Sequence, residues 1–325
     1  MANPAARSGG AVVRPFDLPG ELFGISRWRG GADLIRTWLL IALVAFLCGT
    51  LALAYPVVYA GGVVVVAALQ NHLMVLFHHS IHKNLHPVRR INDWLARWLT
   101  ISPMGQPWGM LRRAHLTHHA YLGEPNDPDR WYYDLDLHGR RRAVVLASWL
   151  GWNCLGGLLV PQLRKALTGF RDRRGDPGTA RGGGDTADRL AVVIVQVTLF
   201  AAFWLLTGTV WGYILLWLLP AITLGGGLNC FRTTLEHADA SEPPRRDLSF
   251  VSNRIERFFV APFNMNYHWE HHLFMSLPYY RMPALRRLLL DRGAYGDALL
   301  VPSYVGRLRE IMAALRRSKV DRRPA

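Results

Sequence analysis

Histidine is the residue type whose spacing in this sequence most clearly indicates chemistry. The chain contains 13 histidines, and ten of them fall in three short clusters. The clusters are His78-His79-Ser80-Ile81-His82 with His86 just beyond, His115-Leu116-Thr117-His118-His119, and His268-Trp269-Glu270-His271-His272. Positions i, i+3 and i+4 share one face of a helix, so the second and third clusters would each present three imidazoles in one direction. His78 and His82 form a similar pair on one helix face.

The number of these imidazoles narrows the kind of metal site. Imidazole nitrogen binds iron, zinc, copper and nickel, so the ligand type alone does not choose the metal. A single catalytic zinc uses about three protein ligands. Eight of the ten clustered histidines have the one-face spacing described above, and His237 offers a further imidazole. This count indicates two metal ions. Two irons could share the electrons needed to cleave O₂ and so produce an oxidant that removes hydrogen from a methylene group. Zinc cannot do this, because it has no redox chemistry.

Isolated histidines have a plainer interpretation. His72 lies inside an apolar run, where a single histidine is more often a hydrogen-bonded packing residue. His138 lies in a polar loop, where its side chain would be solvated. The three clusters are poorly explained by chance, because they share their spacing and lie on the same side of the expected membrane spans.

The elements that must position the clusters are long apolar segments. Hydrophobic residues make up 50% of the chain, and the mean hydropathy of +0.09 is high for soluble domains. Uncharged runs long enough to cross a bilayer cover Thr37–Tyr55, Pro56–Phe77, Leu190–Thr207 and Val210–Leu228. These four runs form two predicted transmembrane hairpins. A further apolar segment, Ala143–Val160, either spans the membrane or lies at its surface as an amphipathic helix.

Charge predicts the orientation of the hairpins. The formal net charge is +15, and nearly all of it comes from arginine. Arginines lie where the chain enters and leaves each hairpin, while the turns near Pro56 and Gly208 carry none. By the positive-inside rule, the histidine clusters would face the cytoplasm. Basic residues beside apolar runs favour a negatively charged membrane surface, so we do not expect nucleic acid as a partner.

The chain organisation follows from these segments. We expect a cytoplasmic N-terminal segment over residues 1–33 and a single membrane domain over residues 34–325, with residues 171–189 as a mobile cytoplasmic linker rich in Gly, Arg and Asp. Val305–Arg317 has apolar residues at helical spacing with arginines between them, which predicts a basic amphipathic helix. The expected fold is an all-α integral membrane protein with about four transmembrane helices in two hairpins, interfacial helices, and a cytoplasmic cap that carries the histidines.

The order of the motifs resembles that of a known superfamily. An H-x3-H, an H-x2-HH, an upstream histidine and a second H-x2-HH, separated by two hairpins, are similar to the membrane fatty acid desaturases and hydroxylases. Asn92-Asp93-Trp94 and the run from Asn264 to His272 agree with this resemblance. It implies a di-iron centre with O₂ as co-substrate. The metal ligands that it implies are His78, His82, His115, His118, His119, His237, His268, His271 and His272.

Two features depart from the common pattern of that superfamily. His79 stands where an acidic or small residue is usual, and His86 forms a second H-x3-H with His82, so which members of the first cluster bind metal stays open. The third cluster begins with His268 and not with Gln, unlike the front-end desaturases that often carry a fused cytochrome b5 domain. Metal-bound imidazoles usually donate to a carboxylate or carbonyl. The nearby carboxylates that could serve, or be ordinary solvated groups or helix caps, are Asp93, Asp127, Glu236, Asp239 and Glu270.

The resemblance implies an O₂-dependent desaturase that acts on a fatty acyl or lipid-like chain. The near alternative is a hydroxylase or ketolase of the same superfamily, acting on a fatty, carotenoid or sterol-like substrate. A distant alternative is a zinc-dependent membrane hydrolase or receptor. The substrate could be linked to lipid, CoA or a carrier protein. The sequence shows no flavin, nicotinamide or iron–sulfur fingerprint, so a separate electron donor such as ferredoxin with its reductase is expected.

Overall fold

The structure is a computed structural model that describes residues 18–51, 55–135, 142–157, 159–160, 186–237, 248–295 and 300–320. The predictions for Asp239, for His138 and for residues 171–185 of the linker lie outside these residues. The chain divides into two compact units. We call Ser26–Ala114 with Trp152–Leu228 the membrane unit, and Met1–Ile25, His115–Gly151 and Asn229–Ala325 the histidine unit.

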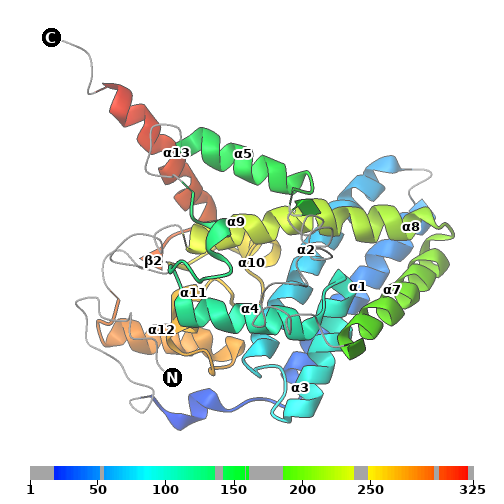
Figure 1. Ribbon diagram of the computed structural model, residues 1–325, viewed down its shortest axis with the longest axis horizontal. Helices are drawn as coiled ribbons and strands as arrows, with labels where there is room; N and C mark the ends of the chain where they lie inside the picture. Colours follow the sequence, from blue (N-terminus) through cyan, green and yellow to red (C-terminus); the bar gives the residue numbers. More distant parts are fainter. Residues whose placement is uncertain are drawn as a thin grey trace, which may run out of the picture. The chain divides into compact units, whose positions relative to one another are not determined.

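Helices make up nearly all of the regular structure in the described residues (Figure 1). They are α1 (Arg29–Leu51), α2 (Pro56–Ile81), α3 (Arg89–Ala96), α4 (Trp108–Tyr121), α5 (Arg142–Cys154), α7 (Thr186–Thr207), α8 (Trp211–Tyr213), α9 (Gly226–Glu236), α10 (Arg254–Phe259), α11 (His268–Leu273), α12 (Met282–Asp291) and α13 (Tyr304–Val320). Two short strands, β1 (Ser249–Phe250) and β2 (Leu300–Val301), pair in parallel. The expected all-α class is confirmed.

Four helical segments of the described residues are long and apolar enough to cross a bilayer. They are Arg29–Leu51, Pro56–Ile81, Thr186–Thr207 and Trp211–Glu236. They confirm the two expected hairpins. The fourth is a continuous run through α8, two π-helical segments on either side of Pro220, and α9. The shorter apolar helix α5 corresponds to the segment expected either to span the membrane or to lie at its surface.

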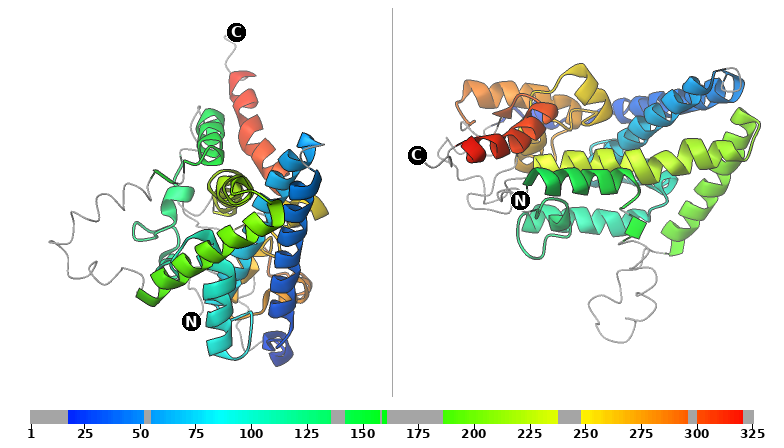
Figure 2. Two further views of the ribbon diagram at one scale, coloured as in Figure 1. Left: turned by 90° about the vertical axis from the view of Figure 1, so that its right-hand side faces the viewer. Right: turned by 90° about the horizontal axis from the view of Figure 1, so that it is seen from above.

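The membrane unit is built on α1, α2 and α7. Figures 1 and 2 show α1 and α2 side by side, and α7 also packs against α1. Large apolar side chains on the outer faces of α1 and α7 are exposed, among them Leu39, Leu43, Val193 and Val197. Helices of this composition are suited to contact lipid on those faces.

Polar side chains inside the membrane unit donate hydrogen bonds to backbone carbonyls. Gln196 Nε2 donates to the carbonyls of Ser102 and Pro103 at 2.8 and 2.9 Å. Trp217 Nε1 donates to the same Pro103 carbonyl at 3.1 Å, and Gln70 Nε2 donates to the Trp217 carbonyl at 2.7 Å. Because backbone groups within a membrane need protein partners, these bonds fix the turn that leads into α4.

The start of α4 is held by a buried carboxylate of α7. Asp188 Oδ2 accepts a hydrogen bond from the Gly109 amide at 2.8 Å, and its Oδ1 lies 2.7 Å from Arg97 Nε. A negative group at a helix N-terminus satisfies free amides and is favoured by the helix dipole. This contact corrects the predicted linker boundary. Residues 186–189 belong to α7 and not to the linker. The prediction treated Asp188 as a solvated charge, whereas it is buried and paired with Arg97.

Two neighbouring glycines of α1 provide a test of the helix packing. A Cβ atom at Gly30 would lie 2.4 Å from the Leu85 carbonyl oxygen, whereas a Cβ at Gly31 would meet nothing within 4 Å. We expect Gly30→Ala to destabilise the protein by about 1–3 kcal/mol through this overlap. Gly31→Ala should be neutral or slightly stabilising because alanine favours the helix. Melting temperatures of the two detergent-purified variants would check this, and equal values would contradict the packing at Leu85.

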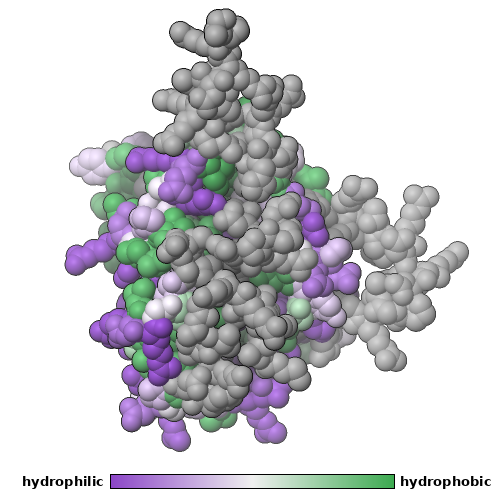
Figure 3. All heavy atoms as spheres, turned by 90° about the vertical axis from the view of Figure 1, so that its left-hand side faces the viewer, coloured by the Kyte–Doolittle hydropathy of each residue, from purple (hydrophilic) through white to green (hydrophobic). Residues whose placement is uncertain are grey.

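The described part of the histidine unit packs on an apolar cluster around α11 and α12. Tyr267 and Phe274 flank α11 and are buried with Leu285 and Leu289 of α12. The predicted C-terminal helix is present as α13. Where Figure 3 shows residues in colour, hydrophilic and hydrophobic side chains lie between one another.

Candidate metal centre

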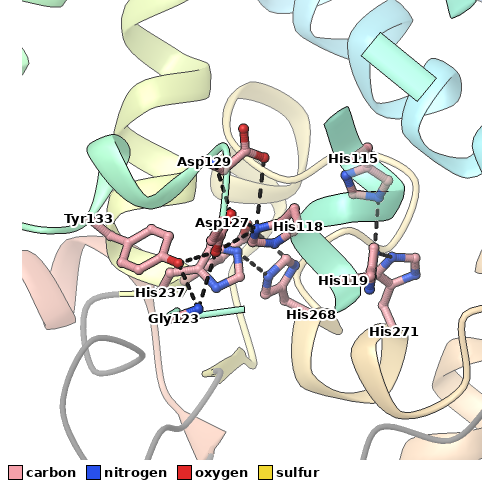
Figure 4. A network of polar contacts seen from close by, with 11 residues as sticks. His115, His118, His119, Gly123, Asp127, Asp129, Tyr133, His237, His268 and His271 are labelled. Atoms are coloured by element: carbon pink, nitrogen blue, oxygen red, sulfur yellow. Dashed lines mark hydrogen bonds and ion pairs between the residues drawn. The ribbon is translucent and has the colours of Figure 1, made fainter. Parts of the chain in front are cut away.

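The second histidine cluster lies on α4, as its spacing predicts. His118 and His119 are buried, and His115 is half-buried. His119 Nε2 lies 2.9 Å from His115 Nε2, so these two rings point at each other one helical turn apart. Figure 4 shows that the three side chains project from one helix.

The third cluster occupies α11 and meets the second cluster within the histidine unit. His268, His271 and His272 are all buried. His271 Nε2 lies 3.3 Å from His119 Nε2, and His268 Nε2 lies 3.0 Å from His237 Nε2 at the end of α9 (Figure 4). Helices distant in sequence thus bring their imidazoles to one place.

Ring nitrogens of six histidines of this unit fall into two groups, while His268, whose Nε2 lies 3.0 Å from His237 Nε2, is in neither group. His115, His119 and His271 offer nitrogens that all lie within 4.8 Å of one another. The nitrogens of His118, His237 and His272 do the same. Two groups of three nitrogens are consistent with the two metal ions that the sequence predicts.

The first cluster lies in the membrane unit, at the end of α2. Ring nitrogens of His78 and His82 lie within 4.8 Å of each other, as expected for a pair on one helix face. His86 Nδ1 accepts a hydrogen bond from the Val88 amide at 3.0 Å. His79 is buried beside His78, with the two ring centroids 5.5 Å apart. Within this cluster, the pairing of ring nitrogens favours His78 and His82 over His86.

The electrostatics of the third cluster suit metal binding. Burial, and then the neighbouring imidazoles, lower the pKa of His268 and of His272 well below the ordinary value. Both rings are therefore neutral near pH 7 and offer lone pairs. A buried set of nitrogen donors suits iron, zinc or copper and does not suit calcium or magnesium, which prefer oxygen. The residues present thus fit transition-metal ions.

Asp127 holds one of these histidines in place. His118 Nδ1 lies 2.9 Å from Asp127 Oδ1, and the same carboxylate accepts hydrogen bonds from the Asp129 amide at 2.8 Å and from the Tyr133 hydroxyl. Burial opposes the charge of Asp127, but the hydrogen bonds from His118 and Tyr133 outweigh it and lower the pKa of this carboxyl. The carboxylate thus favours a proton on Nδ1 of His118, which leaves Nε2 as the ring's lone-pair nitrogen.

The other carboxylates suggested by the sequence have different surroundings. Glu236 Oε2 lies 3.4 Å from His268 Nδ1, so this carboxylate also reaches a histidine of the cluster. Glu270 is fully buried and bound by Arg286 Nε at 2.5 Å and by the hydroxyls of Ser249 and Tyr295. Asp93 accepts from Asn92 Nδ2 at 3.1 Å and lies 3.7 Å from Arg89.

Several partners of these carboxylates were not predicted from the sequence. They are Asp129, Tyr133, Arg232, Ser249, Arg286, Tyr295 and Tyr304. Arg232 precedes Glu236 by four residues, a spacing that places both on one helix face and could have indicated their ion pair. The remaining contacts have no marked spacing signal, because most of these residues act across longer intervals of chain.

Asp127 is expected to affect metal affinity through His118. Asp127→Asn removes the charge that holds the Nδ1 proton, and changes of this kind typically weaken metal binding about 10–100-fold. Asp134→Asn is a suitable control because Asp134 is exposed and paired with Arg130 at 3.0 Å. Titration of the metal-free proteins with Fe(II) would measure both affinities. Equal affinities in the two variants would contradict the role given to Asp127.

Comparison with known proteins gives consistent matches. A family model described as fatty acid desaturase matches residues 54–303, which include the three clusters and His237. The chain is 25% identical over 247 residues to a beta-carotene ketolase of Paracoccus sp. (strain N81106 / MBIC 01143), with 72% of this chain and 82% of that protein covered. It is 26% identical over 229 residues to a beta-carotene ketolase of Paracoccus sp. (strain PC1), with 66% and 74% covered. A dihydrorhizobitoxine desaturase of Bradyrhizobium elkanii is 23% identical over 247 residues, with 73% and 69% covered.

Proposed function

This chain belongs to the fatty acid desaturase family, and from that premise we propose that it is a membrane di-iron desaturase that uses O₂ to form a double bond in a fatty acyl or lipid-like chain. The observation that carries the proposal is the meeting of buried and half-buried imidazoles from α4, from α11 and from His237 just after α9 in two groups of nitrogens. The family match and the four apolar spans support the membrane oxidoreductase class.

We assign nine histidines to the metal ions. They are His78, His82, His115, His118, His119, His237, His268, His271 and His272. Two iron ions held by these side chains would supply the redox chemistry for O₂ cleavage and hydrogen removal. Nitrogen-only donors and neutral rings at His268 and His272 support this assignment.

The chain's own residues would contribute orientation and exclusion of water. Asp127 and Glu236 each lie beside the Nδ1 atom of one histidine and thereby favour a lone pair on its Nε2 atom. Burial of His118, His237 and the third cluster keeps bulk water from the reacting groups. The exposed apolar faces of α1 and α7 would place the protein in the bilayer, from which a lipid-like substrate would arrive.

The proposed reaction needs electrons from another protein. Removal of two hydrogens from adjacent methylenes, together with one O₂, two electrons and two protons, gives a double bond and two waters. A ferredoxin or similar carrier, with its reductase, would deliver the electrons. We place its docking site and the catalytic site on the cytoplasmic side, as the distribution of arginine at the hairpin ends suggests.

Ketolation is a second candidate, because two of the similar proteins are named beta-carotene ketolase. Conversion of a methylene to a ketone consumes two O₂, four electrons and four protons and releases three waters. The same metal centre could serve either reaction, since the outcome depends on which substrate carbon lies nearest the oxidant.

Product analysis would distinguish the two. Cells that express the wild type or His119→Ala are supplied with ¹⁸O₂, in one set with their own lipids and in another with β-carotene. A wild-type-dependent lipid that has lost two hydrogens and contains no ¹⁸O supports desaturation. A product with ¹⁸O supports the ketolase or hydroxylase alternative. Lipids and carotenoids that match those of the His119→Ala cells would contradict both.

A further inference from the structure

Tyr304 is a buried residue that neither the histidine clusters nor the family match explains. It begins α13, one position beyond the matched residues 54–303, and its side chain is 0% exposed. Its hydroxyl donates a hydrogen bond to Glu236 Oε1 at 2.6 Å. Burial and the neighbouring Glu236 raise the pKa of Tyr304 well above its ordinary value, so the hydroxyl keeps its proton and remains a donor.

Glu236 connects this hydroxyl to the third cluster. Its second oxygen, Oε2, lies 3.4 Å from His268 Nδ1 and 3.5 Å from Arg232 Nε. The other nitrogen of His268, Nε2, lies 3.0 Å from His237 Nε2. A carboxylate beside one ring nitrogen favours the proton there and the lone pair on the other nitrogen. Glu236 is therefore placed to direct the His268 lone pair toward His237.

The ring of Tyr304 makes a second connection, through strand β1. It stacks on Phe250, with ring centroids 3.9 Å apart and an interplanar angle of 10°. The Phe250 carbonyl accepts from an Arg286 guanidinium nitrogen at 2.9 Å, and Arg286 binds Glu270 within α11. Tyr304 thus contacts two sets of residues that reach α11, one by its hydroxyl and the other by its ring.

We propose that Tyr304 is a positioning residue that keeps His268 oriented for metal binding through its hydrogen bond to Glu236. The inference rests on the proposed metal-dependent function and adds α13 to the segments that determine metal affinity. α11 has six residues, and a helix this short is not stabilised enough by its own hydrogen bonds. Contacts from outside must fix its direction, and Tyr304 supplies one of them.

The test is the Fe(II) affinity of metal-free, full-length, detergent-purified protein, measured without oxygen. Tyr304→Phe keeps the ring that stacks on Phe250 and removes only the hydroxyl. We expect its affinity to fall about tenfold relative to the wild type. Tyr280→Phe is the matched control, because the Tyr280 hydroxyl donates to the Gly24 carbonyl, and it should keep the wild-type affinity.

A second variant tests the route through Glu236. Glu236→Gln should weaken Fe(II) binding, and combining it with Tyr304→Phe should add little, because both changes interrupt the same series of contacts. Wild-type affinity in Tyr304→Phe, with or without a lower melting temperature, would overturn the inference. If Tyr304→Phe did not fold, unchanged affinity in Glu236→Gln would overturn it. A wild type that bound no Fe(II) would instead contradict the proposed function.

Discussion

His271→Ala is expected to abolish turnover and to lower the iron content of the purified protein. His271 is buried and belongs to the nitrogen group with His115 and His119, so its loss removes one of the proposed ligands from this group. We expect turnover to fall at least about a hundredfold. Membrane insertion should be unchanged, because the substitution lies outside the four apolar spans. Iron analysis, activity and the membrane-fraction yield would be measured on the same preparations.

His86→Ala is the control for this experiment. His86 lies in the first cluster, but its Nδ1 accepts a hydrogen bond from the Val88 amide. It should keep the wild-type iron content and activity. If His271→Ala kept both as well, the ligand assignment would be wrong. Loss of iron in His86→Ala alone would indicate that His86 is a metal ligand of the first cluster.

Arg286→Met is expected to be the most destabilising of the substitutions considered. It would leave the Glu270 carboxylate, which is 0% exposed, without the guanidinium that lies 2.5 Å away. Breaking a buried ion pair by removing one partner typically costs about 3–5 kcal/mol. Arg286 also donates to the Phe250 carbonyl and lies over the Tyr267 ring, so packing around α11 would weaken too. We expect a clearly lower melting temperature and a lower yield of folded protein.

Arg287→Met provides the comparison at the next position of α12. Arg287 is exposed, and exposed charges contribute little to stability. Its variant should melt close to the wild type. Replacing Glu270 as well, in Arg286→Met with Glu270→Gln, should recover part of the lost stability because the buried charge is gone. Equal melting temperatures for Arg286→Met and Arg287→Met would contradict the role of the pair.

The sequence predicted the spans and the histidine helices because both follow from local periodicity. Runs such as Pro56–Phe77 are uncharged over a membrane's thickness, and α2 continues to Ile81, so that His78 lies in its last turn and His82 directly follows it. The i, i+3, i+4 spacing likewise placed His115, His118 and His119 on one helix, and the third cluster on another. These features need no knowledge of distant contacts.

The roles of the carboxylates could not be predicted in the same way. Asp127 and Glu270 are both close in sequence to a histidine cluster, yet Asp127 is hydrogen-bonded to His118, whereas Glu270 binds Arg286. The difference comes from Arg286, sixteen residues further along the chain. Asp188 shows the same effect at a helix end. Its charge suggested a solvated linker, but Arg97 and the Gly109 amide bury it in α7.

Metal analysis of the wild-type protein would show directly whether it holds two iron ions. Protein purified in detergent, without added chelator and at known concentration, would be analysed for iron, zinc and copper together. We expect about two iron ions per chain, one for each group of imidazoles. One zinc ion per chain, with no iron, would contradict the oxidoreductase proposal and favour the zinc-dependent hydrolase or receptor alternative.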